Sequence, residues 1–383
     1  MSSPASGQFD VVVIGAGIAG ASIAYFLGPH RRVLVLEAED RPGLHSTGRS
    51  AALFSETYGS TQVRALTRAS RSFLESPPAG FTRVPLLKQR GALHVGTADE
   101  REQVAALFEQ LRAERGSATW LEADDIHRRV PVMAAGQAEN GVLEAGAADI
   151  DVDALHQGFL RGARCSGVEL QTNAPVTALA TERGGWRIEA GGREWMAALV
   201  VNAAGAWAEQ VGCLAGATPI GLQPKRRSAF LFDPPAGVAV QGWPCVVGIA
   251  EDYYFKPDAG LLLGSPANAD PVPPHDVVPE EIDIATGIDR IERATTMHIR
   301  RPRRTWAGLR SFVPDGDLVG GFDPVLPGLF WMAALGGYGI QTSVAMGAGC
   351  AALVAGNSLP DWVQAEGLTA ASLGIRRLGR SQT

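Results

Sequence analysis

The chain has 383 residues, a formal net charge of −6 and 19% charged residues. This length exceeds one typical hydrophobic core, so we expect two domains or one elaborated α/β domain. The acidic balance disfavours a nucleic-acid partner, and we interpret the basic run at residues 300–304 as a solvated loop or a domain edge.

The four cysteines, Cys165, Cys213, Cys245 and Cys350, lie far apart in the sequence and form no Cys-x-x-Cys pair. We therefore expect reduced thiols, with no disulfide framework and no metal site. The first eight residues are small and polar without a basic segment, and the first apolar run is short. This pattern predicts no signal peptide and no transmembrane segment. We expect a cytoplasmic protein, with peripheral contact to an inner-membrane quinone pool left open.

A glycine-rich turn follows the first apolar run. Residues 11–14 are β-branched and continuously apolar, as a strand buried on both faces requires. They lead into Gly15, Ala16, Gly17, Ile18, Ala19 and Gly20. In such a turn the first glycine permits the tight bend, the second lets a pyrophosphate approach, and the third lets the helix pack closely. The free amides at the helix N-terminus favour an anion.

A second apolar run, at residues 33–36, ends on Glu37. A carboxylate at that position can accept hydrogen bonds from both hydroxyls of an adenosine ribose. Strand, glycine turn, helix, second strand and terminal acid together predict a bound dinucleotide, where a lone glycine motif would be weak evidence.

The later elements follow in chain order. Residues 41–52 read as a loop. Apolar spacing predicts helices at residues 63–74, 100–115 and 151–164, the last with Asp149, Asp151 or Asp153 as candidate N-caps. We expect a buried strand at 194–204, an antiparallel sheet of short strands within 223–263, and an exposed crossing at 266–279. A strand at 329–334, a glycine turn at 336–339 and a small-residue helix at 340–354 repeat the anion-cradling pattern of the first turn.

Four stretches, the opening turn and residues 45–52, 202–207 and 336–342, resemble the D-amino acid oxidase, glycine oxidase and sarcosine oxidase group of FAD enzymes. The similarity covers essentially the whole chain. Residues 45–50, 154–158, 222–230, 264–270 and 306–312 are more specifically similar to bacterial D-arginine dehydrogenase.

This resemblance implies an α/β fold in which a Rossmann-like FAD-binding domain is interleaved with an α+β substrate domain built on an antiparallel sheet. The FAD-binding domain is expected at residues 1–57, 148–215 and 305–383, and the substrate domain at 58–147 and 216–304. The resemblance also implies oxidation of the Cα–N bond of an amino acid. The sarcosine oxidase branch attaches its flavin through a cysteine near the stretch that matches residues 306–317, which contain none here. We therefore predict noncovalent FAD.

The resemblance also implies which residues contact FAD. The glycine turn, including Ala19, meets the pyrophosphate, Glu37 and Ala38 meet the adenosine, and Val176 lies near the adenine. The flavin is expected to contact a longer set: Ser46, Thr47, Gly48, Arg49, Ser50, Ala51, Ala52, Ala204, Gly205, Trp207, Gly336, Gly339, Ile340, Gln341 and Thr342. The N-terminus of the helix expected at residues 340–354 would stabilise negative charge on the reduced flavin ring.

On the substrate side, Arg227 and Arg310 match the arginines with which the family binds a carboxylate, and a guanidinium presents paired donors to two oxygens. By the same resemblance, Tyr58 and Tyr254 lie beside that carboxylate, and the carbonyl of Gly337 accepts the substrate amine. From the residues alone, an arginine beside other basic residues would be interpreted as part of a solvated face.

Two positions depart from the D-arginine dehydrogenase pattern. Leu53 stands where the family has a histidine, and Ala92 where it has a glutamate that pairs with a substrate guanidinium. A buried, unpaired guanidinium costs several kcal/mol, whereas an apolar wall gains about 0.8 kcal/mol per buried methylene. We assign the substrate pocket to Leu53, Ser55, Ala92 and Ile340.

We therefore expect an FAD-dependent oxidative deamination of D-amino acids with neutral, apolar or aromatic side chains. A hydride passes from Cα to flavin N5, and the products are a 2-oxo acid and ammonia. Three alternatives stay open: a secondary-amine oxidase acting on N-alkyl amino acids, a nicotinamide-dependent dehydrogenase, and a non-catalytic dinucleotide sensor. The residues do not decide between oxygen and a quinone as electron acceptor.

Overall fold

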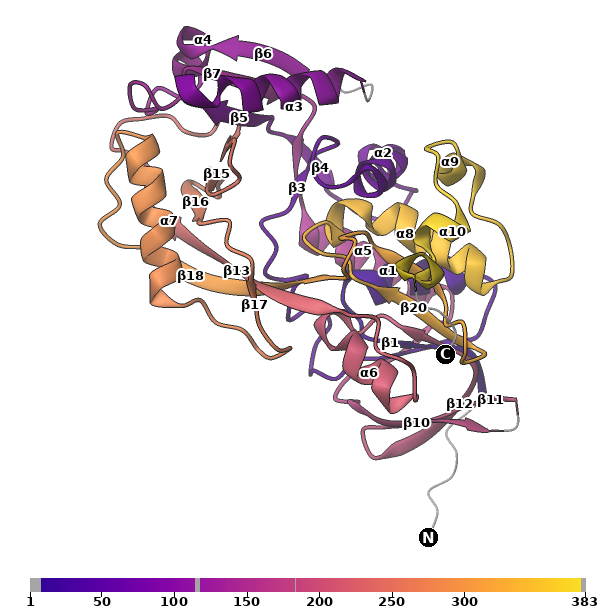
Figure 1. Cartoon of the computed structure of the whole chain (residues 1–383). Helices are drawn as coiled ribbons and strands as arrows, with labels where there is room; N and C mark the ends of the chain where they lie inside the picture. The colour runs from indigo at the N-terminus through magenta and orange to yellow at the C-terminus, as the bar shows by residue number, and fades with distance from the viewer. Residues whose placement is uncertain (1–7, 114–117, 183, 380–383) are drawn as a thin grey trace.

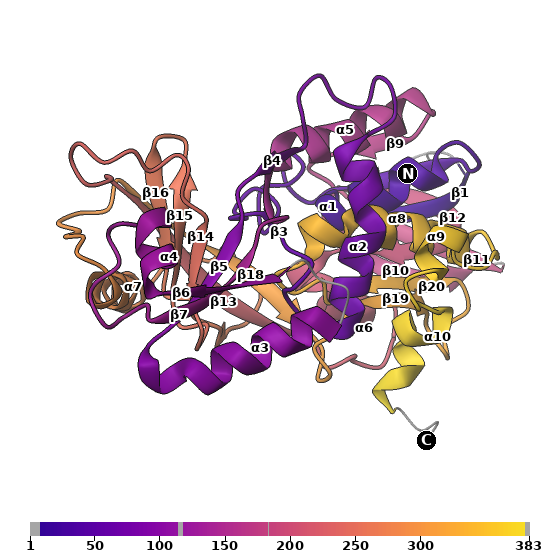
Figure 2. The same cartoon turned by 90° about the horizontal axis from the view of Figure 1, so that it is seen from above.

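A computed structural model describes residues 8–113, 118–182 and 184–379. Two large sheets occupy opposite halves of the molecule in both views (Figures 1 and 2). One half carries the helices α1 (Ile18–Leu27), α2 (Thr61–Glu75), α5 (Val152–Cys165) and α8 (Gly339–Val354). The other half carries α4 (Ala123–Arg129) and α7 (Glu281–Ala294). A fold with helices and sheets in both halves agrees with the predicted α/β class.

The first sheet has eight strands: β1 (Gln8–Ile14), β2 (Val33–Leu36), β9 (Glu169–Gln171), β10 (Val176–Glu182), β11 (Gly185–Ala190), β12 (Arg193–Asn202), β19 (Val319–Phe322) and β20 (Leu329–Ala333). Its centre is parallel, in the order β9, β2, β1, β12 and β20. The remaining strands, β10, β11 and β19, pair with their neighbours in antiparallel fashion. All four apolar runs predicted as buried strands lie in this sheet, because both of its faces are covered and no polar alternation is required.

The second sheet has nine strands: β5 (Ala92–Gly96), β6 (Ala118–Glu122), β7 (Asn140–Glu144), β13 (Gln223–Phe232), β14 (Cys245–Gly248), β15 (Tyr254–Asp258), β16 (Leu261–Ser265), β17 (Asp270–Pro271) and β18 (Arg304–Phe312). The antiparallel sheet predicted within residues 223–263 is confirmed, since β13, β14, β15 and β16 pair antiparallel there. The sheet also includes strands from outside that range, and β14 pairs with one of them, β5, in parallel. The two strands are joined by a long connection rather than a hairpin, and alternation within a strand says nothing about its neighbour's direction.

The strand β18 also departs from the predicted division of the chain. It belongs to the segment from residue 305 onward that we assigned to FAD binding, yet it pairs with β13 in the second sheet over nearly its whole length. The rest of the domain division stays a prediction.

A small third sheet lies at the junction of the two halves. It consists of β3 (Leu53–Phe54), β8 (Ala148–Ile150) and β4 (Leu87–Gln89). The short helices α6 (Ala208–Leu214), α9 (Asp361–Gln364) and α10 (Ala370–Leu373) complete the first half.

The predicted helices are present. The first is α2, and the second is α3 (Arg101–Ala113), whose predicted end at residues 114–115 lies outside the described residues. In α5 the N-cap is Asp151, whose carboxylate accepts a hydrogen bond from the Ala154 backbone N–H at 2.8 Å. The crossing at residues 266–279 is largely exposed, although it contributes β17 and buries Val277.

The glycine turn is held by contacts that exclude side chains. Gly15 has φ +99°, and a Cβ there would lie 2.6 Å from the carbonyl oxygen of Ala203, at the end of β12. A Cβ on Gly20 would lie 1.8 Å from the carbonyl oxygen of Gly15. The turn therefore brings the start of α1 against the ends of β1 and β12, where a ligand can approach the backbone.

The substitution Gly20→Ala is expected to destabilise the protein by more than about 3 kcal/mol, beyond the usual cost of overpacking, because the added methyl overlaps a backbone oxygen. The control is Gly242→Ala, where a Cβ meets nothing within 4 Å. Denaturant unfolding of both variants checks this, and similar stabilities would contradict the packing role of Gly20.

Candidate functional site

A cavity that is partly open to solvent lies between the two halves of the molecule. On the first half it is lined by the start of α1, the loop at residues 46–52 and the start of α8. On the second half it is lined by one face of the nine-stranded sheet. Two helix N-termini thus face one cavity, and each favours negative charge.

The lining of the sheet side follows strand alternation, in which every second residue points to the same face. Alternate residues of five strands line the cavity: Ala92 and His94, Cys245 and Val247, Tyr254 and Lys256, Arg227 and Ala229, and Gly308 and Arg310. The opposite face is apolar and packs against α7, with Phe230, Phe255 and Ile291 in one core. The sheet therefore separates a hydrophobic core from a chemically varied cavity wall.

The first half of the cavity fits a dinucleotide. Its walls present backbone more than side chains, and the Thr47 hydroxyl accepts a hydrogen bond from the Ile18 N–H at 3.0 Å, which ties the loop to the glycine turn. The amide nitrogen of Gln341 is buried and has no hydrogen-bond partner in the part of the chain that the structure describes. This unpaired donor beside the cavity, together with the glycine cradle, suits a polar ring system such as a flavin.

Glu37 lies next to the turn, but its contacts differ from the expected ones. Its carboxylate accepts the Ala16 N–H at 2.8 Å and the Glu39 N–H at 3.1 Å, and it does not line the cavity. On the other side of the turn, His156 Nε2 lies 2.8 Å from the Ala16 carbonyl oxygen. The sequence analysis assigned no role to His156, although the residue lies in the stretch 154–158 that carries the resemblance.

The loop at residues 45–52 is fastened to β18. The Ser46 hydroxyl donates to the Leu309 carbonyl at 2.7 Å, and the Trp306 indole N–H donates to the Arg49 carbonyl at 3.0 Å. The Arg49 guanidinium donates to the carbonyls of Val277 and Ala307 at 2.8 and 3.2 Å and pairs with Asp276. The loop therefore has a fixed position between the two halves.

The structure sorts the predicted cofactor residues into two sets. Those that line the cavity are Gly17, Ile18, Ala19, Ser46, Thr47, Arg49, Ser50, Ala51, Ala52, Gly205, Gly336, Gly339, Ile340 and Gln341. Those that do not are Gly15, Ala16, Gly20, Glu37, Ala38, Gly48, Val176, Ala204, Trp207 and Thr342. Trp207, for example, packs against the ring of His45 at 4.6 Å, and Val176 packs against the core of the first sheet.

The five predicted catalytic residues all line the cavity: Tyr58, Arg227, Tyr254, Arg310 and Gly337. Arg310 donates to the Tyr58 hydroxyl at 3.3 Å. A Cβ on Gly337 would lie 2.8 Å from the Arg310 Cζ atom, so only glycine leaves room for this guanidinium. Leu53, Ser55, Ala92 and Ile340, the predicted pocket residues, line the same cavity.

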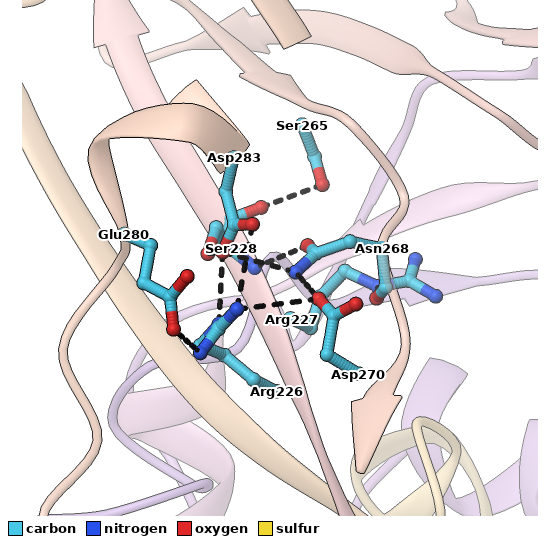
Figure 3. A network of polar contacts seen from close by, with 8 residues as sticks. All are labelled: Arg226, Arg227, Ser228, Ser265, Asn268, Asp270, Glu280 and Asp283. Atoms are coloured by element: carbon cyan, nitrogen blue, oxygen red, sulfur yellow. Dashed lines mark hydrogen bonds and ion pairs between the residues drawn. The ribbon is translucent and has the colours of Figure 1, made fainter. Parts of the chain in front are cut away.

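Arg227 faces the cavity because its neighbour Arg226 takes the acidic partners. Arg226 points to Asp283, at 2.8 Å, and to Glu280, whereas Arg227 leaves β13 in another direction and donates to the Asn268 carbonyl (Figure 3). The expectation that an arginine in this basic run faces bulk solvent is thereby excluded for both residues.

The two cavity arginines repel each other. Burial, and next the charge of Arg310, lower the pKa of Arg227. Within the described residues, neither guanidinium has a carboxylate partner. Glu251 also lines the cavity and its charge acts on Arg227, but it forms no ion pair with either guanidinium. Two half-buried cations that face one space without a directly paired carboxylate favour a ligand that brings one.

A clamp of three charged residues, missed by the sequence analysis, lies at the far end of the cavity. The Lys256 ammonium lies 2.7 Å from one oxygen of Asp149, and the Arg90 guanidinium lies 2.6 Å from the other. Lys256 lines the cavity and its side chain is 5% exposed. Because Asp149 is on β8 and Lys256 on β15, the clamp joins the small sheet to the large one. We had expected an apolar wall near Ala92, and the presence of Lys256 shows that this wall is not wholly apolar.

Glu144 lies behind Ser55. Its carboxylate accepts hydrogen bonds from the Ser55 hydroxyl at 2.6 Å, the Thr57 hydroxyl and the Glu56 N–H. Burial raises its pKa. Ser55 in turn donates its backbone N–H to Gln341 at 3.1 Å. This chain of contacts connects the wall at Ser55 to the start of α8.

Among the described residues, the four cysteines are unpaired and no cluster of metal-ligating side chains is found. In the same residues, no helix combines the length and hydrophobicity needed to cross a bilayer.

The substitution Asp149→Asn is expected to cost about 3–5 kcal/mol of unfolding free energy, because it leaves two buried cations without a counter-charge. The control Asp233→Asn removes the exposed partner of Arg303 and is expected to cost less than about 1 kcal/mol. Urea denaturation of both variants measures the difference, and equal losses would show that the clamp is not needed for stability.

Comparison with known proteins agrees with this geometry. The model of the family described as FAD dependent oxidoreductase (DAO) matches residues 10–353. The mitochondrial dimethylglycine dehydrogenase of Rattus norvegicus is 28% identical over 267 residues, which cover 67% of this chain. This chain therefore spans only about 30% of the length of that relative.

Two glycine oxidases match over nearly their full length. That of Bacillus licheniformis is 25% identical, with 94% of this chain and 96% of the relative covered. The crystal structure of glycine oxidase from Geobacillus kaustophilus has a TM-score of 0.81 at 21% identity, with 92% of this chain and 96% of that chain covered. The fold, the cavity and the family match together show that this chain belongs to the family of FAD-dependent oxidoreductases and that FAD is its cofactor.

Proposed function

We propose that this protein oxidises the Cα–N bond of D-amino acids with neutral, apolar or aromatic side chains and yields a 2-oxo acid and ammonia. The observation that carries the proposal is the pair Arg227 and Arg310, which face one cavity while neither guanidinium forms an ion pair with a carboxylate of the described residues. FAD, held noncovalently, supplies the acceptor for the hydride that leaves Cα, and either oxygen or a quinone then accepts the electrons.

The side chains of the cavity bind and orient the substrate. The two guanidinium groups hold its carboxylate, and each charge-assisted hydrogen bond contributes about 1.5–3 kcal/mol. The rings of Tyr58 and Tyr254 exclude water from this contact and add hydroxyl donors. The carbonyl of Gly337, directly beside Arg310, accepts a hydrogen bond from the substrate amine. Together these groups turn Cα toward the half of the cavity that binds FAD.

The opposite wall argues against cationic side chains. Ala92 is 1% exposed and brings no charge where a guanidinium would need an acid. Its neighbourhood includes the ammonium of Lys256, which repels a second cation. The likeness of several stretches to D-arginine dehydrogenase is therefore an indication of fold and carboxylate binding, and we do not extend it to the substrate side chain.

A panel of amino acids tests this proposal directly. We expect D-leucine, D-methionine and D-phenylalanine to reduce the bound flavin anaerobically, and D-arginine to react at least about a hundredfold more slowly, because an unpaired buried guanidinium costs several kcal/mol. The L-enantiomers serve as the matched control. The proposal fails if D-arginine exceeds these three substrates by tenfold or if the L-enantiomers react equally well.

The second candidate function is that of a secondary-amine oxidase, which is tested by adding sarcosine and N-methyl amino acids to the same panel. Two observations favour it: Leu53 and Ala92 leave space for an N-substituent, and the dimethylglycine dehydrogenases are among the relatives. Turnover of sarcosine or N-methyl amino acids, with primary D-amino acids inert, would establish that activity instead.

The substitution Arg310→Lys is expected to lower kcat/KM by about 10- to 100-fold, mainly through KM, because a lysine ammonium cannot form the paired bonds of a guanidinium. The control Arg300→Lys alters an exposed residue and should leave kinetics unchanged. Steady-state kinetics with D-leucine and a dye acceptor measure both, and an unchanged KM in the Arg310 variant would remove this residue from carboxylate binding.

A further inference from the structure

One polar side chain of the cavity wall has no protein partner. His94 lies on β5, two residues from Ala92 on the same face, and is 7% exposed. Within the residues that the structure describes, neither ring nitrogen forms a hydrogen bond or an ion pair. A buried imidazole without a partner is costly unless a ligand or water satisfies it.

The neighbours of His94 on the sheet cannot supply that partner. Val247 on β14 and Val142 on β7 stand directly opposite it on the two flanking strands. Burial lowers the pKa of His94 to about 4, so the ring is neutral at neutral pH. A neutral imidazole offers one N–H donor and one acceptor nitrogen. His94 therefore presents a neutral hydrogen-bonding group to the cavity, between the two valines that flank it on the sheet.

The position of His94 relates it to the carboxylate site. Val247 is also opposite Tyr254 on β15, so His94 and Tyr254 lie two strands apart on one face. Neighbouring strands are spaced by about 4.8 Å, which separates the two residues by about 10 Å. A ligand whose carboxylate lies beside Tyr254 thus needs an extended side chain to reach His94.

We propose that His94 recognises the end of the substrate side chain, and that the preferred substrates are D-amino acids whose long neutral side chain carries a hydroxyl, a carboxamide or an indole N–H. This rests on the proposed function, since it assumes an amino acid held by Arg227 and Arg310. Lys256 on the same wall disfavours cationic ends, and its ammonium is already paired with Asp149 at 2.7 Å rather than free to pair with an anionic end. A purely apolar side chain leaves the imidazole unpaired, which is the basis for discrimination.

Matched substrate pairs test this inference. D-tyrosine is compared with D-phenylalanine, and D-glutamine with D-methionine, by the rate of anaerobic flavin reduction and by kcat/KM. We expect the polar member of each pair to be preferred by about tenfold in the holoenzyme. Equal values, or a preference for the apolar members, would overturn the role of His94.

Variants of His94 test whether this residue causes the preference for the polar substrates. His94→Phe should abolish it by slowing the polar substrates while the apolar ones react as before, and His94→Asn should retain part of it. His298→Phe, at an exposed histidine, is the control and should keep the wild-type ratio. The ratio between paired substrates does not change with a general loss of folded protein, so a purely structural role would leave it unmoved.

The outcomes separate this inference from the function on which it rests. If no amino acid of any pair reduces the flavin, the proposed function fails. If both members react at equal rates, only the role of His94 fails. A wild-type preference that persists in His94→Phe would place recognition elsewhere and also reject the proposal.

Discussion

The repulsion between Arg227 and Arg310 is the constraint around which the cavity is arranged. Two cations without an acidic partner are unfavourable in a buried space, so the surrounding structure must hold them there. Acidic side chains near β13 are directed to Arg226 instead, on the side of α7 (Figure 3). Gly337, without a side chain, gives Arg310 room. In the function that we propose, the carboxylate of the substrate relieves this unfavourable charge.

The strand β18 connects this charge to the cofactor side. It carries Arg310 toward the cavity, and its carbonyls accept hydrogen bonds from Ser46 and Arg49 of the loop that lines the first half. The same strand pairs with β13, which carries Arg227. One strand thus sets the distance between the carboxylate site and the flavin loop, and a division of the chain at residue 305 cuts through this connection.

The sequence analysis succeeded where the signal is local. Apolar runs predicted the central strands of the first sheet, and the glycine spacing predicted the turn that Gly15 and Gly20 form. It did not foresee the parallel pairing of β14 with β5 and was incomplete for the cavity wall, because both depend on which strands become neighbours. His94 and Lys256 are marked by no motif, and only the register of β5, β14 and β15 brings them to one face. Glu37 was found from its position after β2, but its contact with Ala16 depends on the fold of the turn.

The two halves of the cavity recognise their ligands by different means. The first half uses backbone groups, glycines and helix ends, which leave few positions free to change without loss of the fold. The second half uses alternate side chains of strands whose other face already supplies the core. Substitutions at positions such as Ala92 and His94 therefore alter the substrate wall without disturbing either the core or the cofactor side. Under the proposed function, this separation makes the strand face, rather than the glycine turn, the part of the molecule that determines substrate choice.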